Sequence, residues 1–376
     1  MMRIGAIGAR LQRISWIMVL TIAALMVIGI MFVYSAEYVS SGEWESSVPK
    51  YQRQIMWALA GIVCYFCVAA MDYHRLGKLS GWIYLIGILL LIVVLVPGVG
   101  VKKYGAQRWI RLPFFTMQPS ELVKLAVLLA LAQYMSRPDV DLRNMRTVLI
   151  VLALIGLPFV LIARQPDLGT AMVLVPFAFV MMLIAGVQVR VLVTIVVIGL
   201  MLVPVAWFNM DDYQQDRIRV FLGIDQDPLG TGWTKIQSKL AVGSGALVGK
   251  GFLRGTQNIL GFLPRSVAPT DFIYSVIAEE RGFIGSASVL ILFAILIVCG
   301  MRTALLTRDK FGRLLAVGVV TILFAHTFVN IAMTIGLMPI TGLPLPLLSY
   351  GGTFTISTMA GLGLLQSVYI RRPRNA

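Results

Sequence analysis

Charged residues are scarce in this chain. They make up 13% of its 376 residues, whereas about 25% is usual for a soluble globular protein. Hydrophobic residues reach 58%, and the mean hydropathy is +0.86. This composition excludes a soluble globular protein and indicates a membrane protein that crosses the bilayer several times.

Cysteine is also rare, with three residues in the whole chain. Cys64, Cys67 and Cys299 all fall inside predicted membrane spans. The spacing of the first two is that of a redox pair, but within a membrane helix it favours packing of small residues. The chain has no internal repeat, low-complexity tract or Ser/Gly-rich linker. A single membrane domain over residues 1–376 is therefore the simplest description.

Only two histidines occur. His326 and Asn330 lie one helical turn apart in a predicted span, and His74 is the only other histidine, so the sequence offers no set of histidine metal ligands. We interpret His326 and Asn330 as polar contacts between helices.

Ten apolar runs are long enough to cross a bilayer core of about 30 Å. The fourth is short and has polar flanks, so nine spans are the alternative. The first follows several arginines but is too long for a cleaved signal sequence and lacks a cleavage site, so we expect a retained helix. The runs cover residues 14–34, 55–71, 81–97, 122–136, 147–163, 169–186, 190–208, 283–301, 314–335 and 353–370.

The predicted fold is therefore an all-α polytopic integral membrane protein of about ten transmembrane helices. One large outer loop, residues 209–282, separates spans seven and eight. Lys and Arg divide evenly between the two faces, but long loops cross a membrane largely regardless of charge. The short connections favour cytoplasmic termini. The basic residues of the two long outer segments, 98–121 and 209–282, then need an explanation of their own.

The first of these segments ends with Glu121 and Lys124, one turn apart at the start of the fourth span. One interpretation is that the two side chains neutralise each other at the membrane edge. The other adds Arg108 and Arg111 and predicts a basic recess suited to phosphate, because a guanidinium can bind two oxygens at once.

Two further features allow more than one interpretation. Asp167 lies in the tight turn "RQPDLGT" and could cap the sixth span or line a site. Glycines surround Lys250 in "GSGALVGKGF", but their spacing is wrong for a phosphate-binding P-loop.

The stretch "PTDFIYSVIAEERG" places three carboxylates beside a long apolar run, where unpaired charges are costly. Asp271 could act as the N-cap of a short helix that ends near Gly282, or as a catalytic group. On that helix Asp271 and Glu279 share a face, while Glu280 points away. Either glutamate could pair with an outer arginine or help to hold a cation.

Several motifs occur in one order along nearly the whole chain. They are "GAQRW…QPSELVKL", "QPDLGT", "DPLGTGW…QSKLAVGSGALVGKG", "LP…TDFI…AEERG" and "GLPLPLLSYGG". In the order of these motifs the sequence resembles the shape, elongation, division and sporulation (SEDS) family. Two further motifs, "GTQN…FLP" and "FVNIAMTIG", resemble the elongation branch of that family, RodA, more than its division branch, FtsW. The resemblance implies ten membrane helices and a peptidoglycan glycosyltransferase that polymerises lipid II on the outer face for cell elongation and rod shape.

The resemblance also implies site residues. Asp271 matches the essential aspartate of the family. Arg108, Glu121, Lys124 and Asp167 match polar positions around its central cavity.

One segment departs from the family pattern. The family has a glutamate and a histidine before its Thr-Asp-Phe motif, whereas "LPRSVAPTDF" has Arg265 at the glutamate position, lacks the histidine and is two residues longer. The motif itself is intact, with Thr270 before Asp271.

The chemistry of joining two lipid-linked disaccharides assigns roles to these residues. A base must take a proton from the attacking hydroxyl, and Asp271 can do so. Cations must meet the pyrophosphate that leaves. The candidates for binding substrate are Arg108, Glu121, Lys124, Asp167, Arg217, Lys239, Thr270, Glu279 and Glu280. No cofactor is certain, and a divalent cation such as Mg²⁺ stays open.

The expected partners are lipid II, membrane lipid and a class B penicillin-binding protein, with no nucleic acid. The expected location is the bacterial cytoplasmic (inner) membrane. Two other functions stay open, a lipid II flippase and a non-catalytic scaffold of the wall-synthesis complex. A transporter tends to show inverted repeats, and a scaffold would not need Asp271.

Overall fold

The computed structural model of the protein describes residues 13–38, 48–103, 106–113, 115–208, 210–224 and 230–372. Within these ranges the chain forms thirteen helices and three short strands. Nine of the described helices are long and apolar enough to cross a membrane. They are α2 (Trp16–Glu37), α3 (Lys50–Ala70), α4 (Tyr73–Leu95), α6 (Met145–Ala163), α7 (Leu168–Ala185), α8 (Val189–Phe208), α12 (Ile273–Leu306), α13 (Lys310–Thr334) and α14 (Gly352–Ile370).

The predicted fourth span corresponds to α5 (Pro119–Ser136), which is less apolar than these nine helices. It packs against α4, α6, α7, α13 and α14, and most of its residues are buried. Because other helices surround α5, it can carry Glu121 and Lys124 without exposing either charge to lipid. The prediction of an all-α polytopic membrane protein is confirmed, with α5 inside the bundle.

Helix α12 spans 34 residues with a break at Gly282, where φ is 63° and ψ is −158°. A helix of that length would measure about 51 Å, well beyond a bilayer core of about 30 Å. Glycine adopts this positive φ without the steric cost that a Cβ would add. The residues before the break therefore form a separate half-helix, in agreement with the predicted short helix that ends near Gly282.

Residues 246–251 fill this break with backbone hydrogen bonds. Such bonds are needed because a helix end leaves amides and carbonyls without partners. Before the break, the carbonyls of Glu279 and Glu280 accept from the amides of residues 250 and 251, both at 3.0 Å. After the break, the amides of Phe283 and Ile284 donate to the carbonyls of residues 246 and 247, at 2.8 and 3.1 Å.

The predicted outer segments contain more structure than their sequences indicate. Segment 209–282 holds α9 (Asp212–Leu222), α10 (Thr231–Ser244) and α11 (Thr256–Ile259). Segment 98–121 forms an antiparallel sheet in the order β1-β2-β3, from β1 (Gly100–Lys103), β2 (Ala106–Arg111) and β3 (Thr116–Met117). These strands are too short to show a clear alternation of apolar and polar residues, and the sequence did not predict them.

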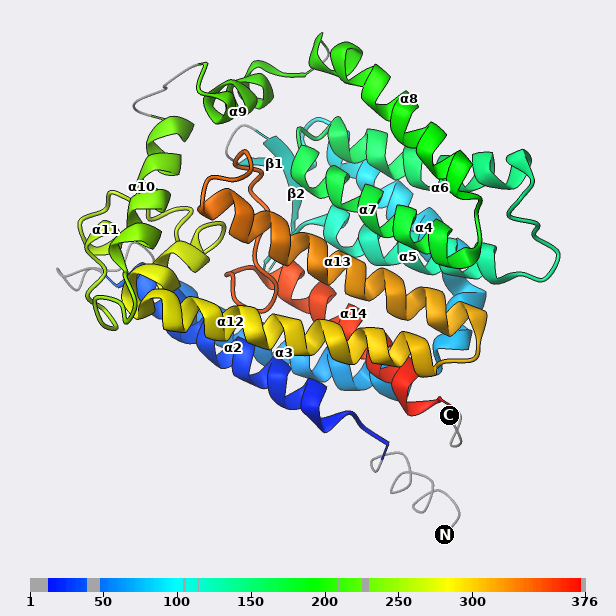
Figure 1. Cartoon of the computed structure of the whole chain (residues 1–376), viewed down its shortest axis with the longest axis horizontal. Helices are drawn as coiled ribbons and strands as arrows, with labels where there is room; N and C mark the ends of the chain where they lie inside the picture. The colour runs from blue at the N-terminus through cyan, green and yellow to red at the C-terminus, as the bar shows by residue number, and fades with distance from the viewer. Residues whose placement is uncertain are drawn as a thin grey trace.

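The bundle has two distinct ends (Figure 1). Helix α2 begins and α14 ends at one of them, while α9, α10 and α11 gather at the other, which we call the loop end. Gln226, in the predicted large outer loop, and Ala376, at the C-terminal end, lie outside the described residues.

Candidate active site

Asp271 lies at the loop end, in the turn that leads into α12. The carbonyl of Val267 accepts hydrogen bonds from the amides of Thr270 (3.2 Å), Asp271 (2.9 Å) and Phe272 (3.2 Å). The N-cap of α12 is Phe272, and no side chain caps this helix. The alternative that Asp271 serves as an N-cap is therefore wrong, because the turn delays the first helical residue to Ile273.

The backbone of Asp271 is held from inside the bundle. Asn330 of α13 is fully buried, and its side-chain amide donates to the carbonyls of Asp271 (2.8 Å) and Leu343 (2.7 Å). This confirms Asn330 as a buried polar contact, although its partners are loop carbonyls and not a second helix.

The loop between α13 and α14 supports the same turn. The amide of Tyr350 donates to the carbonyl of Pro269 at 2.8 Å. The hydroxyl of Ser349 donates to the carbonyl of Thr270, whose own hydroxyl donates to Val267 at 3.1 Å. Because this turn is held by hydrogen bonds from several sides, the Asp271 side chain starts from a fixed backbone, as a catalytic group requires.

The carboxylate of Asp271 and the guanidinium of Arg217 face the same space above Gly342. A Cβ placed on Gly342 would lie 3.5 Å from Asp271 Oδ2 and 3.9 Å from Arg217 Nη1. Arg217 belongs to α9. The long loop thus places Arg217 near Asp271, although the two residues are more than fifty positions apart in the sequence.

The surroundings of Asp271 raise the pKa of its carboxyl to about 6. Burial is the largest cause, because removal from water disfavours the charged form. The positive charge of Arg217, a hydrogen bond with the Thr270 side chain and the charge of Arg108 oppose this rise, while the negative charge of Asp167 adds to it. A carboxyl group with this pKa can take up a proton near neutral pH.

Arg108 and Asp167 form a second pair nearby. Arg108 Nη1 lies 3.6 Å from Asp167 Oδ1, and the Arg108 side chain is 14% exposed. Its Nε donates to the carbonyl of Gln165 at 3.2 Å and its Nη2 to that of Pro166. Arg111, the other arginine of the predicted basic recess, is exposed.

Asp167 fills both roles considered for it. Its Oδ1 accepts from the amide of Thr170 at 3.3 Å and so caps α7. Its Oδ2 accepts from Gln118 Nε2 at 3.0 Å. A carboxylate has enough lone pairs to serve the cap, Gln118 and the nearby Arg108 together.

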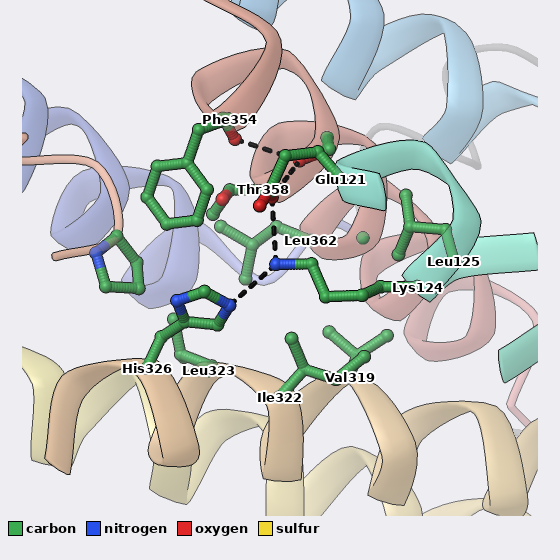
Figure 2. A pocket seen from close by; sticks show the side chains of 13 residues that line it. Glu121, Lys124, Leu125, Val319, Ile322, Leu323, His326, Phe354, Thr358 and Leu362 are labelled. Atoms are coloured by element: carbon green, nitrogen blue, oxygen red, sulfur yellow. Dashed lines mark hydrogen bonds and ion pairs between the residues drawn. The ribbon is translucent and has the colours of Figure 1, made fainter. Parts of the chain in front are cut away.

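Glu121 and Lys124 form a separate cluster inside the bundle (Figure 2). Lys124 Nζ lies 2.8 Å from Glu121 Oε2 and 2.7 Å from His326 Nε2. All three residues are at most 3% exposed. Lys124 also lies over the Phe354 ring, with its Nζ 5.5 Å from the ring centroid. The interpretation that the pair neutralises itself describes this geometry better than an open phosphate recess.

The cavity beside this cluster measures about 30 Å³. A cavity of about 10–15 Å³ holds one water molecule. This space therefore has room for water beside the buried charges.

Glu279 and Glu280 point in different directions, as the helical spacing predicts, and both hold the loop. Glu279 is fully buried, and its Oε1 lies 2.7 Å from Lys250 Nζ. The same oxygen accepts from Thr256 Oγ1 (3.1 Å) and from the amide of Gln257 (2.9 Å).

Glu280 accepts from the hydroxyl of Ser35 on α2 and, at 3.2 Å, from the amide of Leu253. Among the described residues no group of three or more His, Cys, Asp or Glu side chains could hold a metal ion. A divalent cation at the site stays a prediction.

Lys239 belongs to α10. It is exposed, and its aliphatic chain lies against Gly336, where an added Cβ would come within 2.8 Å of Lys239 Cδ. The structure thus brings Arg217, Arg108 and Asp167 close enough to Asp271 for their charges to act on its carboxyl group.

Sequence reasoning missed the link between His326 and Lys124, which lie 202 positions apart. It also missed Gln118, which orients Asp167. The only signal for these residues was a polar side chain in or beside an apolar run, which marks a buried contact but does not name its partner.

Comparisons with known proteins identify the family and the fold. The family model FtsW/RodA/SpoVE, described as cell cycle protein, matches residues 15–373. The chain is similar to peptidoglycan glycosyltransferase MrdB of Escherichia coli K12, with 38% identity over 356 residues, 94% of this chain and 93% of MrdB. It is also similar to a probable peptidoglycan glycosyltransferase FtsW of Trichlorobacter lovleyi, with 35% identity, 96% of this chain and 94% of the relative.

Solved structures show the same fold. A chain from a peptidoglycan synthase complex, studied for its structural coordination of polymerization and crosslinking, superposes with a TM-score of 0.77 at 30% identity, covering 95% of this chain and 97% of that one. The rod shape determining protein RodA of Thermus thermophilus gives a TM-score of 0.71 at 29% identity, with 96% and 97% covered. A match over nearly the whole length by sequence and by fold shows that this chain belongs to the FtsW/RodA/SpoVE family, the SEDS family that its motifs resemble.

Proposed function

We propose that this protein is a peptidoglycan glycosyltransferase that joins lipid II disaccharides into glycan strands. The observation that carries the proposal is Asp271, a carboxylate with a raised pKa, fixed in a braced turn and facing Arg217. The family's relatives named as peptidoglycan glycosyltransferases support the same activity.

The proposed reaction uses Asp271 as a general base. A hydroxyl of the acceptor sugar attacks the anomeric carbon of the donor, and its proton passes to the carboxylate. The bond from that carbon to the lipid pyrophosphate breaks, and the pyrophosphate leaves with the bonding electrons. At neutral pH a carboxyl group with a pKa of about 6 is mostly deprotonated and can accept this proton.

Arg217 and Arg108 are the cations placed to meet the leaving group. Both act electrostatically on Asp271, so both lie close to the proposed reaction centre. A guanidinium can contact two phosphate oxygens and stays charged at any working pH. Arg108 is already oriented by Asp167, so binding the pyrophosphate would cost it little further ordering.

The proposal includes a place in the cell and a partner. We propose one membrane domain, residues 1–376, in the bacterial cytoplasmic membrane, with both termini cytoplasmic and segment 209–282 outside. The shared end of α2 and α14, opposite the loop end, supports the placement of both termini on one face of the membrane (Figure 1). The structural likeness to a synthase complex that couples polymerization to crosslinking supports a class B penicillin-binding protein as partner.

The test is polymerisation of labelled lipid II by the purified protein, with and without its partner, beside a lipid II translocation assay in vesicles. A polymerase makes glycan chains, and Asp271→Asn abolishes them without affecting translocation. Translocation lost in that variant would instead show a flippase. If the unchanged protein shows neither activity by itself, and the complex with its partner polymerises lipid II equally well with the Asp271→Asn variant, the protein is a scaffold.

A further inference from the structure

Helix α10 carries its apolar residues on the outside. Trp233, Ile236 and Leu240 are 37%, 51% and 50% exposed, and their spacing of three and four residues places them on one face. Gln237 and Ser238 of the same helix are buried. This is the reverse of a helix that packs an apolar stripe on a protein core.

The buried face of α10 is bound by polar contacts. The hydroxyl of Ser238 donates to the carbonyl of Thr334 at 2.7 Å and lies 2.8 Å from the hydroxyl of Ser275. Helix α10 is thus fixed to α13 and to the half-helix that begins after Asp271. Because α10 is held through its polar face, its apolar face points away from the bundle.

The apolar face continues into a surface that belongs to a membrane span. Leu247 and Val248, in the turn after α10, are 68% and 72% exposed. The carbonyl of Leu247 accepts from the amide of Ile284 at 3.1 Å. Phe283 and Ile284, 67% and 58% exposed, are the first residues of the apolar part of α12. The exposed apolar residues at the start of the span and in the turn after α10 are therefore neighbours.

We propose that α10 lies in the interfacial layer of the bilayer leaflet at the loop end, with Trp233, Ile236, Leu240 and residues 247–248 at the boundary of the acyl chains. Amphipathic helices with basic residues beside an apolar face lie in this layer, and tryptophan is enriched there. Lys239, exposed beside the apolar face, can reach lipid phosphates.

The direction of α10 fits this position. In Figure 1 it runs across the direction of α12 and α13, at the loop end of the bundle. A helix that crosses the direction of the spans lies along the membrane surface. Lipid is favoured over a protein partner as the occupant, because the same surface continues onto the lipid-facing residues of α12.

Together with the proposed function, this position has a consequence for catalysis. Ser238 ties α10 to Ser275, one turn into the half-helix that follows Asp271. An α10 embedded at the level of the lipid phosphates would hold Asp271 at a fixed height above the bilayer. The substrate's pyrophosphate, carried on a lipid, would then meet the carboxylate at that height.

The experiment uses the full chain with Cys64, Cys67 and Cys299 replaced by alanine, in vesicles of phosphatidylcholine and phosphatidylglycerol. Single cysteines at Ile236 and Leu240 carry a spin label. Its collisions with oxygen, which concentrates in the bilayer, are compared with collisions with a water-soluble nickel chelate.

The matched control label is placed at Asp212, an exposed residue of α9. We expect the labels at 236 and 240 to collide preferentially with oxygen and the control label with nickel. Equal nickel accessibility at all three positions would overturn the proposal. Nickel accessibility that is lost only after a partner protein is added would assign the face to that protein and also overturn it. Neither result depends on glycosyltransferase activity.

A second variant tests the same surface without a label at the substituted positions. Ile236→Ser with Leu240→Ser should cause a spin label at position 247 to lose its oxygen preference. Leu222→Ser with Ile224→Ser, which removes two exposed apolar residues of the loop outside α10, should leave that preference intact. The same loss in both double variants would contradict a specific contact of α10 with lipid.

Discussion

Asn330, buried in α13, donates one hydrogen bond to the carbonyl of Asp271 at 2.8 Å and another to the carbonyl of Leu343 at 2.7 Å. A single side-chain amide therefore joins the turn that carries the carboxylate to the loop that leads towards α14. Both carbonyls come from segments without regular structure, so neither has a helical partner of its own. The position of the proposed base depends on a residue that does not touch its carboxylate.

Replacing Asn330 by Leu should lower both stability and activity. Two carbonyls lose their donor, and a buried polar group without a partner costs about 1–3 kcal/mol. Glycan polymerisation should fall in protein that remains folded, because Asp271 loses a fixed backbone. Thr327→Val is the control, since Thr327 donates only within its own helix, to Leu323 at 2.9 Å. Normal polymerisation by Asn330→Leu would show that the turn is held without it.

Asp271→Asn should remove activity and leave the fold intact. The carboxylate does not cap α12, so its loss should not weaken the helix. Polymerisation of labelled lipid II should fall by at least about 10²-fold, the low end for loss of a general base. Asp271→Glu should recover little of the activity, because the longer side chain moves the carboxylate by about 1 Å, and a misplacement of about 1 Å can also lower the rate by about 10²-fold. Full activity of the Asn variant would exclude Asp271 as the base.

The activity should rise with pH through about 6, the pKa of Asp271, because the base must be deprotonated to accept a proton. The charge of Arg217 lowers this pKa. Arg217→Gln removes that charge, so the pKa should rise further and the ascending limb should move to higher pH. Measuring the initial rate of polymerisation from pH 5 to 8 checks both points. A limb that moves to lower pH in Arg217→Gln would contradict the assignment.

The buried pair of Glu121 and Lys124 should behave as one unit. Removing one partner leaves an uncompensated buried charge, which costs about 3–5 kcal/mol. Lys124→Met alone should therefore lower the melting temperature strongly. The double variant Glu121→Leu with Lys124→Met should be close to the unchanged protein in stability, with polymerisation near normal. A folded double variant without activity would instead give the pair a direct role in the reaction.

A reporter that is active only outside the cytoplasm tests the orientation. Fused after Gln226 it should be active, and fused after Asp309 or at Ala376 it should be inactive. The loop end and the end that holds α14 lie on opposite sides of the bundle (Figure 1). The same signal at Gln226 and Ala376 would contradict the three crossings, by α12, α13 and α14, that lie between these two positions.

The sequence determined the class of fold, the spans and the family. Membrane spans are readable because lipid requires long apolar helices with their own backbone hydrogen bonds. The break near Gly282 was also readable, since this glycine follows Glu279, Glu280 and Arg281 and precedes an apolar run. The motif around Asp271 identified the candidate base. These signals are local, and each depends on neighbouring residues in the chain.

Only the tertiary structure decided which charges meet. Arg217 lies near Asp271 although its helix comes more than fifty residues earlier, and His326 contacts Lys124 across 202 positions. Nothing local to these residues encodes such a contact, because it arises when helices distant in sequence pack together. The structure also decided that Asp271 is not a cap. A backbone turn centred on the carbonyl of Val267 set the start of α12, and the geometry of that turn depends on bonds from the bundle behind it.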